Sequence, residues 1–250
     1  MYNINNGVIK MKQESLDKIK ILNKLINESK NIVFFGGAGV STESGIPDFR
    51  SSSGLFTKNL SAEEIVSHSY FICNTSSFYK FYKEKMMYLN AKPNLCHIKL
   101  AELEKIKNLT IITQNIDGLH QLAGSKNVIE LHGTILKNHC IDCLKEFSAS
   151  YVKNYDGVPR CDNCNGIIKP DVVLYEEQLN YDDIENAIKA LENADLVIVG
   201  GTSLKVYPAA GLLNYTRAKN KVLINLNDNP KEDYLYINEK IGEVFSKLEF

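Results

Sequence analysis

The chain has 250 residues, of which 44% are apolar and 24% are charged. These values are typical of globular proteins and exclude a disordered chain. The net charge is −1 at pH 7, so no overall field attracts nucleic acid or an anionic membrane. The longest apolar runs are strand-sized, far below the roughly 18–20 residues of a membrane span. Because the N-terminal segment is polar and lacks the apolar core of a signal peptide, we expect a cytoplasmic protein.

Apolar patterns along the chain predict strands that alternate with helices. Residues 14–28 carry apolar side chains at helical spacing, which predicts an amphipathic helix. The apolar run Ile32–Phe35 follows and ends in four small residues, as a buried strand does when it enters a turn. Further strands are expected at 109–113, 128–131, 196–199 and 221–226, and helices at 96–105, 181–191 and 209–219. This alternation favours an α/β fold with a parallel sheet covered on both faces.

Two segments interrupt the alternation. Residues 134–169 hold four of the six cysteines and few strong elements, which indicates an insertion folded around something other than an apolar core. Residues 51–90 are irregular, with aromatic helical turns at 71–88. We interpret the latter segment as a lid or as the second half of a small domain.

A glycine turn follows the first strand. Bare backbone N–H groups at Gly37, Ala38 and Gly39, with Thr42 close behind, suit a diphosphate at the start of a helix. The full G-x-G-x-x-G pattern is absent, so an ordinary turn is the alternative. The next segment contains Asp48, Phe49 and Arg50, which we interpret either as a loop that closes over a dinucleotide or as a surface loop with a chance ion pair.

Polar side chains also follow the next two predicted strands. Gln114, Asn115 and Asp117 surround Ile116 at a strand end, where α/β sheets bind their ligands. Asparagine and aspartate suit a carboxamide ligand, and an Asx-turn is the alternative. His132 follows the third strand and is a candidate general base, although a lone histidine is more often structural.

The two C-x-x-C pairs are the strongest signal in the residues themselves. Cys140 and Cys143 are followed, after a gap of 17 residues, by Cys161 and Cys164. This spacing supplies four thiolates for a closed, structural Zn²⁺ site. Two disulfides are the weaker interpretation in a reducing compartment. At two later strand ends, Gly201-Thr202-Ser203 and Asn225 are placed to meet a ribose or an adenine.

Taken together, these motifs resemble the sirtuin family of NAD-dependent protein deacylases. The resemblance rests on 37–41, 44–50, 113–117, 131–133, the four cysteines, 201–204 and 225–226, in the family's order. It implies a Rossmann-like doubly wound parallel sheet formed by 14–50, 91–133 and 171–250. It also implies a helical module at 51–90 and a zinc-ribbon module at 134–170. Within this single catalytic domain, NAD is consumed as a co-substrate and one Zn²⁺ is structural.

The resemblance also implies roles for single residues. His132 acts as the base on the ribose hydroxyls, Asn115 and Gln114 line the ribose, and Asp117 with the Ile116 backbone anchors nicotinamide. Phe49 screens the cationic intermediate, and the remaining cofactor contacts fall on Gly37, Ala38, Gly39, Thr42, Asp48, Arg50, Gly201, Thr202, Ser203, Asn225 and, by a loose alignment, Ile241. The activity implied is transfer of an acetyl group from a protein lysine to ADP-ribose.

The acetylated protein or peptide is expected on a strand around 169–177. Val172, Val173 and Tyr175 line its edge and the lysine tunnel, and Glu176 stands where many members have glycine. Sirtuins that remove succinyl or malonyl groups resemble one another in a Tyr-x-x-Arg pair. Tyr79 matches that tyrosine, but Tyr82 stands where the arginine would be, so we expect a preference for acetyl groups.

Three other functions are weighed against this one. A nicotinamide dehydrogenase would want the third glycine and an acid about 20 residues further on. A zinc-ribbon nucleic-acid binder would want a basic face, whereas residues 137–169 carry nearly balanced charges. A mono-ADP-ribosyltransferase would share the NAD site and differ only in the acceptor, so it stays as the alternative.

Overall fold

The computed structural model describes residues 11–48, 61–226 and 231–250. Its main element is a six-stranded sheet in the order β3-β2-β1-β7-β8-β9, and every neighbouring pair is parallel. Counted within this sheet alone the order is 3-2-1-4-5-6, which is the Rossmann order. The strands are β1 (Asn31–Gly36), β2 (Asn108–Thr113), β3 (Val128–Glu130), β7 (Leu196–Gly200), β8 (Asn220–Ile224) and β9 (Leu235–Ile237). The predicted α/β class is confirmed, and β9 is a strand that the apolar pattern did not predict.

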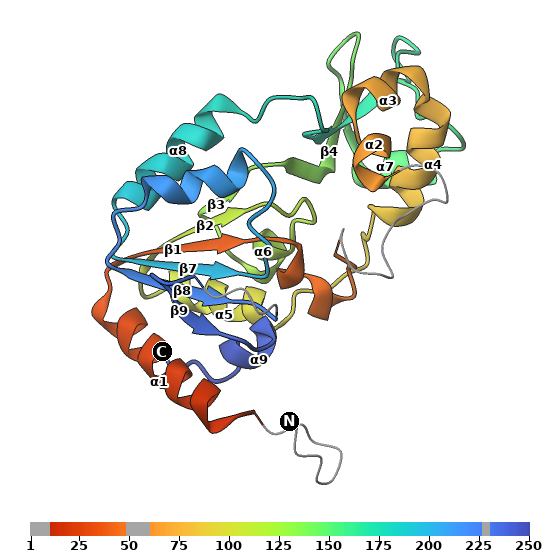
Figure 1. Cartoon of the computed structure of the whole chain (residues 1–250). Coiled ribbons are helices and arrows are strands. Elements are labelled where there is room, and N and C mark those ends of the chain that lie inside the picture. The colour runs from red at the N-terminus through yellow and green to blue at the C-terminus, as the bar shows by residue number, and fades with distance from the viewer. Residues whose placement is uncertain (1–10, 49–60, 227–230) are drawn as a thin grey trace, which may run out of the picture.

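Helices cover both faces of the sheet because its strands are apolar on both sides (Figure 1). In β1, Ile32 and Phe34 face one core, whereas Val33 and Phe35 face the other. The first core is closed by α1 (Gln13–Glu28), α5 (Leu95–Glu104) and α9 (Ile241–Phe245). The second is closed by α8 (Tyr181–Glu192) and the 3₁₀ segment η3 (Ala209–Tyr215).

The helix expected at 209–219 is therefore wrong in type and length. The chain forms a 3₁₀ segment that ends at Tyr215. Glycine in the middle of the segment, at Gly211, disfavours an α-helix. The hydroxyl of Thr216 then accepts a hydrogen bond from the backbone N–H of Ala218, which turns the chain toward β8.

A smaller region lies beyond one end of the main sheet (Figure 1). It contains the antiparallel sheet β5-β4-β6 and four short helices. The elements are β4 (Gly133–Cys140), β5 (Glu146–Ser148), β6 (Ile168–Val172), α2 (Ala62–Ile65), α3 (His68–Cys73), α4 (Thr75–Lys85) and α7 (Ala149–Asn154). Among the described residues, no helix is both long and apolar enough to cross a membrane.

This smaller region has an apolar core of its own, which corrects the prediction for 134–169. Ile135, Phe147 and Ile168 of the cysteine-bearing segment are buried in one cluster with Phe78 and Tyr82 of the helices. The single apolar residues of the insertion are too widely spaced to show a pattern. They form a core only because aromatic side chains from another part of the chain complete it.

Candidate functional site

The candidate site lies at the carboxyl ends of the parallel strands. The strand order reverses between β1 and β7, and ligands of open α/β sheets bind in the crevice at such a point. Turns that carry predicted residues leave the ends of β1, β2, β3, β7 and β8 at this edge. The residues that the sequence spreads over about 190 positions are therefore brought together by the sheet.

The glycine turn after β1 packs directly against the turn after β7. The Gly39 N–H donates to the Gly201 carbonyl at 2.7 Å, and a Cβ on Gly39 would lie 2.8 Å from Gly201. Gly39 is thus required by the contact between two turns. The helix expected here consists of two short 3₁₀ turns, η1 (Ala38–Val40) and η2 (Thr42–Ser44), so a full helix dipole is not present. The Thr42 hydroxyl donates to the Gly39 carbonyl at 3.0 Å, which binds the second of these turns to the first.

Thr202 is hydrogen-bonded to two other predicted residues of the site. Its hydroxyl accepts a hydrogen bond from Gln114 Nε2 at 3.2 Å, and its carbonyl accepts one from Asn225 Nδ2 at 3.0 Å. Ser203 follows it in the same turn. Tyr236, which the sequence analysis did not select, donates from its hydroxyl to the Asn225 carbonyl at 3.2 Å. The predicted ribose and adenine residues therefore form one connected group.

Ser41 lies between the two polar residues of the turn after β2. Asn115 Nδ2 donates to the Ser41 hydroxyl at 3.0 Å, and that hydroxyl donates to Asp117 Oδ2 at 2.7 Å. The other oxygen of Asp117 accepts from the Leu119 N–H at 2.9 Å. Burial raises the pKa of Asp117. Ser41 was missed as a site residue, although its place directly after the glycine turn is a signal that could have identified it.

His132 is held in one orientation by the main chain. Its Nδ1 lies 2.9 Å from the Gln114 carbonyl, which can only accept, so Nδ1 carries the proton. Nε2 is then the atom with a free lone pair. Burial lowers the pKa of His132, so the ring is neutral at pH 7. The arrangement therefore supplies a neutral general base at the end of β3, with Nε2 free to accept a proton.

The segment expected to bind the substrate begins directly beside this base. The Val173 N–H donates to the His132 carbonyl at 2.9 Å. Gly133 has φ +70°, and any side chain there would collide with the Asp171 carbonyl, so only glycine permits this close approach. The strand β6 ends at Val172, earlier than the expected stretch of 169–177. At this end of the segment Val172 and Leu174 are buried in the core, whereas Val173 is partly buried and Tyr175 is exposed.

Glu176 adopts the backbone conformation that favours glycine, with φ +75°. Its carboxylate accepts hydrogen bonds from the Ser69 N–H at 2.8 Å and from the Ser69 hydroxyl at 2.6 Å. These bonds connect the segment to α3 and offset the strain of a left-handed glutamate. Tyr175 and Glu176 also line a pocket of about 550 Å³ with residues of α2 and α3.

Tyr79 and Tyr82 lie inside the core of the small region. They are 1% and 0% exposed, in the same cluster as Val172, and Ile116 packs against that cluster. The Tyr79 hydroxyl donates to the Ile168 carbonyl. The Tyr82 hydroxyl has no hydrogen-bond partner among the described residues. The two tyrosines therefore share one apolar core with Val172 and Leu174 of the substrate segment.

The remaining predicted cofactor residues lie in different surroundings. Ile241 is 4% exposed at the start of α9 and packs in the large core, against Gly200. Asp48 is half-buried at the end of the first described range. Phe49 and Arg50 lie outside the described residues, so their predicted roles stay predictions.

The four cysteines converge as predicted, because the two C-x-x-C turns face each other. Their sulfur atoms all lie within 4.8 Å of one another, with Cys140 and Cys164 at 3.4 Å and Cys143 and Cys161 at 3.6 Å. Sulfurs bound tetrahedrally to zinc at 2.3 Å would lie about 3.8 Å apart. The cage therefore fits Zn²⁺, and with four protein ligands it has no open position for catalysis.

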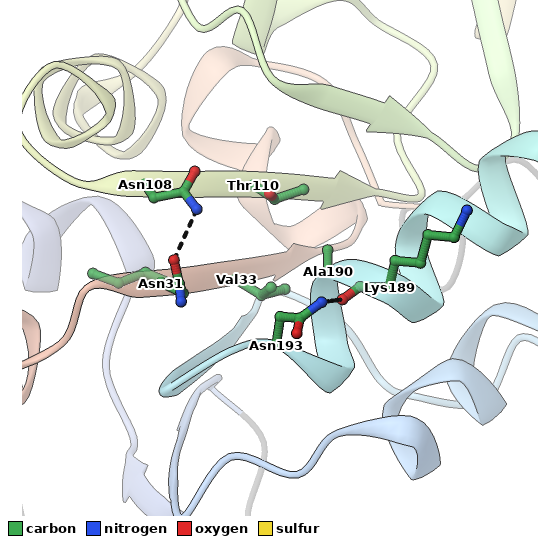
Figure 2. A pocket seen from close by; sticks show the side chains of 8 residues that line it. Asn31, Val33, Asn108, Thr110, Lys189, Ala190 and Asn193 are labelled. Carbon is green, nitrogen blue, oxygen red and sulfur yellow. Dashed lines mark hydrogen bonds between the residues drawn. The ribbon is translucent and has the colours of Figure 1, made fainter.

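A pocket of about 210 Å³ lies at the opposite edge of the main sheet. Figure 2 shows it between α8 and the amino ends of β1 and β2. Asn31 and Asn108 meet there through a hydrogen bond of 2.8 Å between their side chains. Since ligands bind outside the carboxyl ends of such strands, this pocket is not the candidate site.

Comparisons with known proteins agree with this geometry. The family model described as "Sir2 family" matches residues 37–208. An NAD-dependent protein deacetylase of Clostridium tetani is 57% identical over 241 residues, which cover 93% of this chain and 98% of that protein. A protein of the same name from Clostridium perfringens is 55% identical over 240 residues and covers 93% and 98%.

Two solved structures are similar in fold. One, described as Sir2 bound to acetylated peptide, has a TM-score of 0.80 and 38% identity over 92% of this chain and 96% of that one. The other is described as a Sir2 complex with a p53 peptide and NAD⁺. It has a TM-score of 0.80 and 39% identity, and covers 95% and 97%.

Proposed function

Because this chain belongs to the Sir2 family, we propose that it is an NAD-dependent protein-lysine deacetylase. The reaction moves the acetyl group from a protein lysine to ADP-ribose and releases nicotinamide. The observation that carries the proposal is the position of His132. Its ring is bonded to Gln114 among the cofactor residues, and its carbonyl is bonded to Val173 in the substrate segment.

His132 would act as the general base on a ribose hydroxyl of NAD. The Gln114 carbonyl fixes the proton on Nδ1 and leaves Nε2 free to accept another. A neutral ring at pH 7 is the protonation state that a base needs. Because burial lowers the pKa of His132, the acid limb of the reaction would lie below the ordinary histidine value of about 6.5.

The residues after β2 would hold the nicotinamide half of NAD. Asp117 and the Ile116 backbone offer partners for the carboxamide, and Asn115 lies beside them. Ser41 fixes Asn115 and Asp117 relative to each other through its two hydrogen bonds. The pyridinium loses its charge when nicotinamide leaves, so the site needs a carboxamide anchor more than an acid.

The diphosphate and adenosine half would lie along the turns after β1, β7 and β8. The predicted contacts there are Gly37, Ala38, Gly39, Thr42, Gly201, Thr202, Ser203 and Asn225. Their mutual hydrogen bonds hold the turns in place before NAD arrives. Such preorganisation lowers the cost of binding.

The acetylated peptide would add its backbone to the segment from Val172 to Tyr175. Its lysine would then point toward His132, which the same segment contacts.

The four cysteines would hold Zn²⁺ as a structural ion, away from the reacting atoms. A structural metal site built from four cysteines also favours a cytoplasmic location.

The proposed function is tested by mixing the protein with NAD and an acetylated peptide and following nicotinamide. We expect nicotinamide release to require the acetyl group, with an unacetylated peptide as the control. Release that is equal with both peptides would contradict deacetylation and favour transfer of ADP-ribose to another acceptor.

A further inference from the structure

Two histidines that the proposed chemistry does not use are buried side by side, and one of them lies on the helix that follows the nicotinamide residues. His97 of α5 is 0% exposed and His120 of α6 (Leu119–Ala123) is 1% exposed. Their ring centroids are 4.7 Å apart, and Phe34 of β1 packs edge-on against His120. His97 Nε2 and both nitrogens of His120 have no hydrogen-bond partner among the described residues. Buried polar atoms without partners are costly, so this arrangement needs an explanation.

The tautomers of the two rings can be worked out from their surroundings. The Asn94 N–H donates to His97 Nδ1 at 3.2 Å, so in the neutral ring the proton lies on Nε2. Burial lowers the pKa of His97 to about 4 and that of His120 to about 3, so both rings are neutral at pH 7. His97 then offers one donor, while His120 offers one donor and one acceptor. A single water can accept from His97 Nε2 and donate to the unprotonated nitrogen of His120.

Each histidine is also connected to one side of the candidate site. Asn94, which bonds His97, donates from Nδ2 to the Val40 carbonyl at 2.7 Å and to the Ser44 hydroxyl at 3.0 Å. On the other side, His120 belongs to α6, whose first N–H, that of Leu119, donates to Asp117. Through Asn94 and α6, the histidine pair thus connects the turns after β1 with the turn after β2, which Ser41 also connects through its own hydrogen bonds.

We propose that His97 and His120 are positioning residues that share an enclosed water and fix Asp117 relative to the Val40–Ser44 turns for NAD binding. This inference rests on the proposed function, because it deepens the role of the same site. Neither ring touches the reacting atoms. The pair acts through Asn94 and through α6.

The test measures the equilibrium affinity for NAD by calorimetry in His120→Phe and His97→Leu. Both substitutions fill the buried position with an apolar side chain and remove the ring nitrogens. We expect NAD to bind about 10-fold more weakly in each, with the affinity for acetylated peptide unchanged. The double variant should bind no more weakly than the weaker single variant, because both lose one shared link. His97→Asn keeps an acceptor for the Asn94 N–H and should restore part of the affinity.

Leu100→Val on α5 is the matched control, since it loosens the same helix without removing a polar group. If it weakens NAD binding as much as the histidine variants at equal loss of Tm, the pair is merely structural. If His120→Phe does not fold, His120→Asn takes its place, with the same expected loss. NAD affinity within twofold of the wild type in both histidine variants would overturn the proposal. So would a parallel loss of peptide affinity.

The acetyl-transfer activity of the wild-type protein is measured alongside. A wild type that binds NAD without deacetylating would contradict the proposed function, and the NAD affinities would still decide the role of the pair. A wild type that does not bind NAD would overturn both.

Discussion

The main sheet and the smaller cysteine-bearing region are stabilised by different means. The sheet has apolar strands in its interior, and separate clusters of aliphatic and aromatic side chains lie on its two faces. The smaller region has one cluster, and it is assembled from the helices at 62–85 together with the segment 135–174. Both pieces contribute buried side chains to this one cluster. The shared aromatic cluster joins the two pieces, and the four cysteines hold together the two turns of the second piece.

Two lysines show how the pieces of the smaller region are joined. Lys83 of α4 donates to the Tyr155 carbonyl at 2.5 Å and to the Gly157 carbonyl at 2.7 Å. In return, Lys153 of α7 donates to the Lys83 carbonyl at the end of α4. Each piece thus supplies an ammonium group to backbone carbonyls of the other. The proposed NAD residues come from the sheet, whereas the proposed peptide residues come from the smaller region, so the site depends on both means of stabilisation.

Removing zinc should have the largest effect and should separate the two regions. A structural zinc site contributes on the order of 10–16 kcal/mol to folding. We expect a chelator to abolish activity and to remove hydrogen-exchange protection from β4, β6 and α4, while β1 and β7 stay protected. Metal analysis should find one zinc per chain before treatment. Active protein without zinc would contradict the structural role of the four cysteines.

The next largest effect is expected from His132→Ala. Loss of a general base typically lowers the rate by 10²–10⁴-fold or more. NAD should still bind, because its proposed contacts lie mainly on the turns after β1, β2, β7 and β8. Steady-state kinetics and calorimetry check the two halves of this prediction. Near-normal deacetylation by the folded variant would remove His132 from the mechanism.

The choice of acyl group should depend on the smaller region. A buried succinyl carboxylate needs a paired cation, and by the family resemblance Tyr82 stands where the arginine would be needed. Lys83 does not substitute, since its ammonium group is bonded to the carbonyls at 155 and 157. If the missing pair is worth about 3 kcal/mol, deacetylation should exceed desuccinylation by roughly 10²-fold in kcat/KM. Propionyl peptide is the uncharged control, and equal rates with succinyl peptide would contradict this interpretation of the pocket.

The smallest effect is expected from Lys83→Met, which removes the hydrogen bonds from the Lys83 ammonium group to the carbonyls at 155 and 157. Hydrogen bonds to charged groups contribute about 1.5–3 kcal/mol, so the free energy of unfolding should fall by about that amount. Lys80→Met on the exposed face of the same helix is the control. Hydrogen exchange should show the loss in α4 and α7 and not in the main sheet. An equal loss of stability in both variants would show that the Lys83 hydrogen bonds do not join the two pieces.

Most of the sheet could be predicted from the sequence because its strands are continuous apolar runs. The exception is β9, which has only three residues. Its central Tyr236 packs against the second core and also donates from its hydroxyl to the Asn225 carbonyl. The core of the smaller region could not be predicted, because its members are distant in sequence and single in each segment. The cysteine cage was predictable since its spacing alone defines it.

The candidate site shows the same division. The polar residues at strand ends could be selected from the sequence, because the carboxyl ends of parallel strands meet at one edge. Ser41 could have been selected from its place directly after the glycine turn. The pair His97 and His120 could not, since its role depends on ring contacts and hydrogen bonds between segments far apart in the chain. Gly39 was selected for phosphate binding, whereas the structure gives it a second role in the contact with Gly201.

The central claim is that the candidate site transfers an acetyl group from a protein lysine to ADP-ribose. The most direct test uses a peptide labelled in the acetyl group together with NAD labelled in the adenosine part. We predict that both labels appear in one small product, O-acetyl-ADP-ribose, in equal amounts with free nicotinamide and deacetylated peptide. Adenosine label attached to protein, with the acetyl group still on the peptide, would contradict the account and identify a mono-ADP-ribosyltransferase.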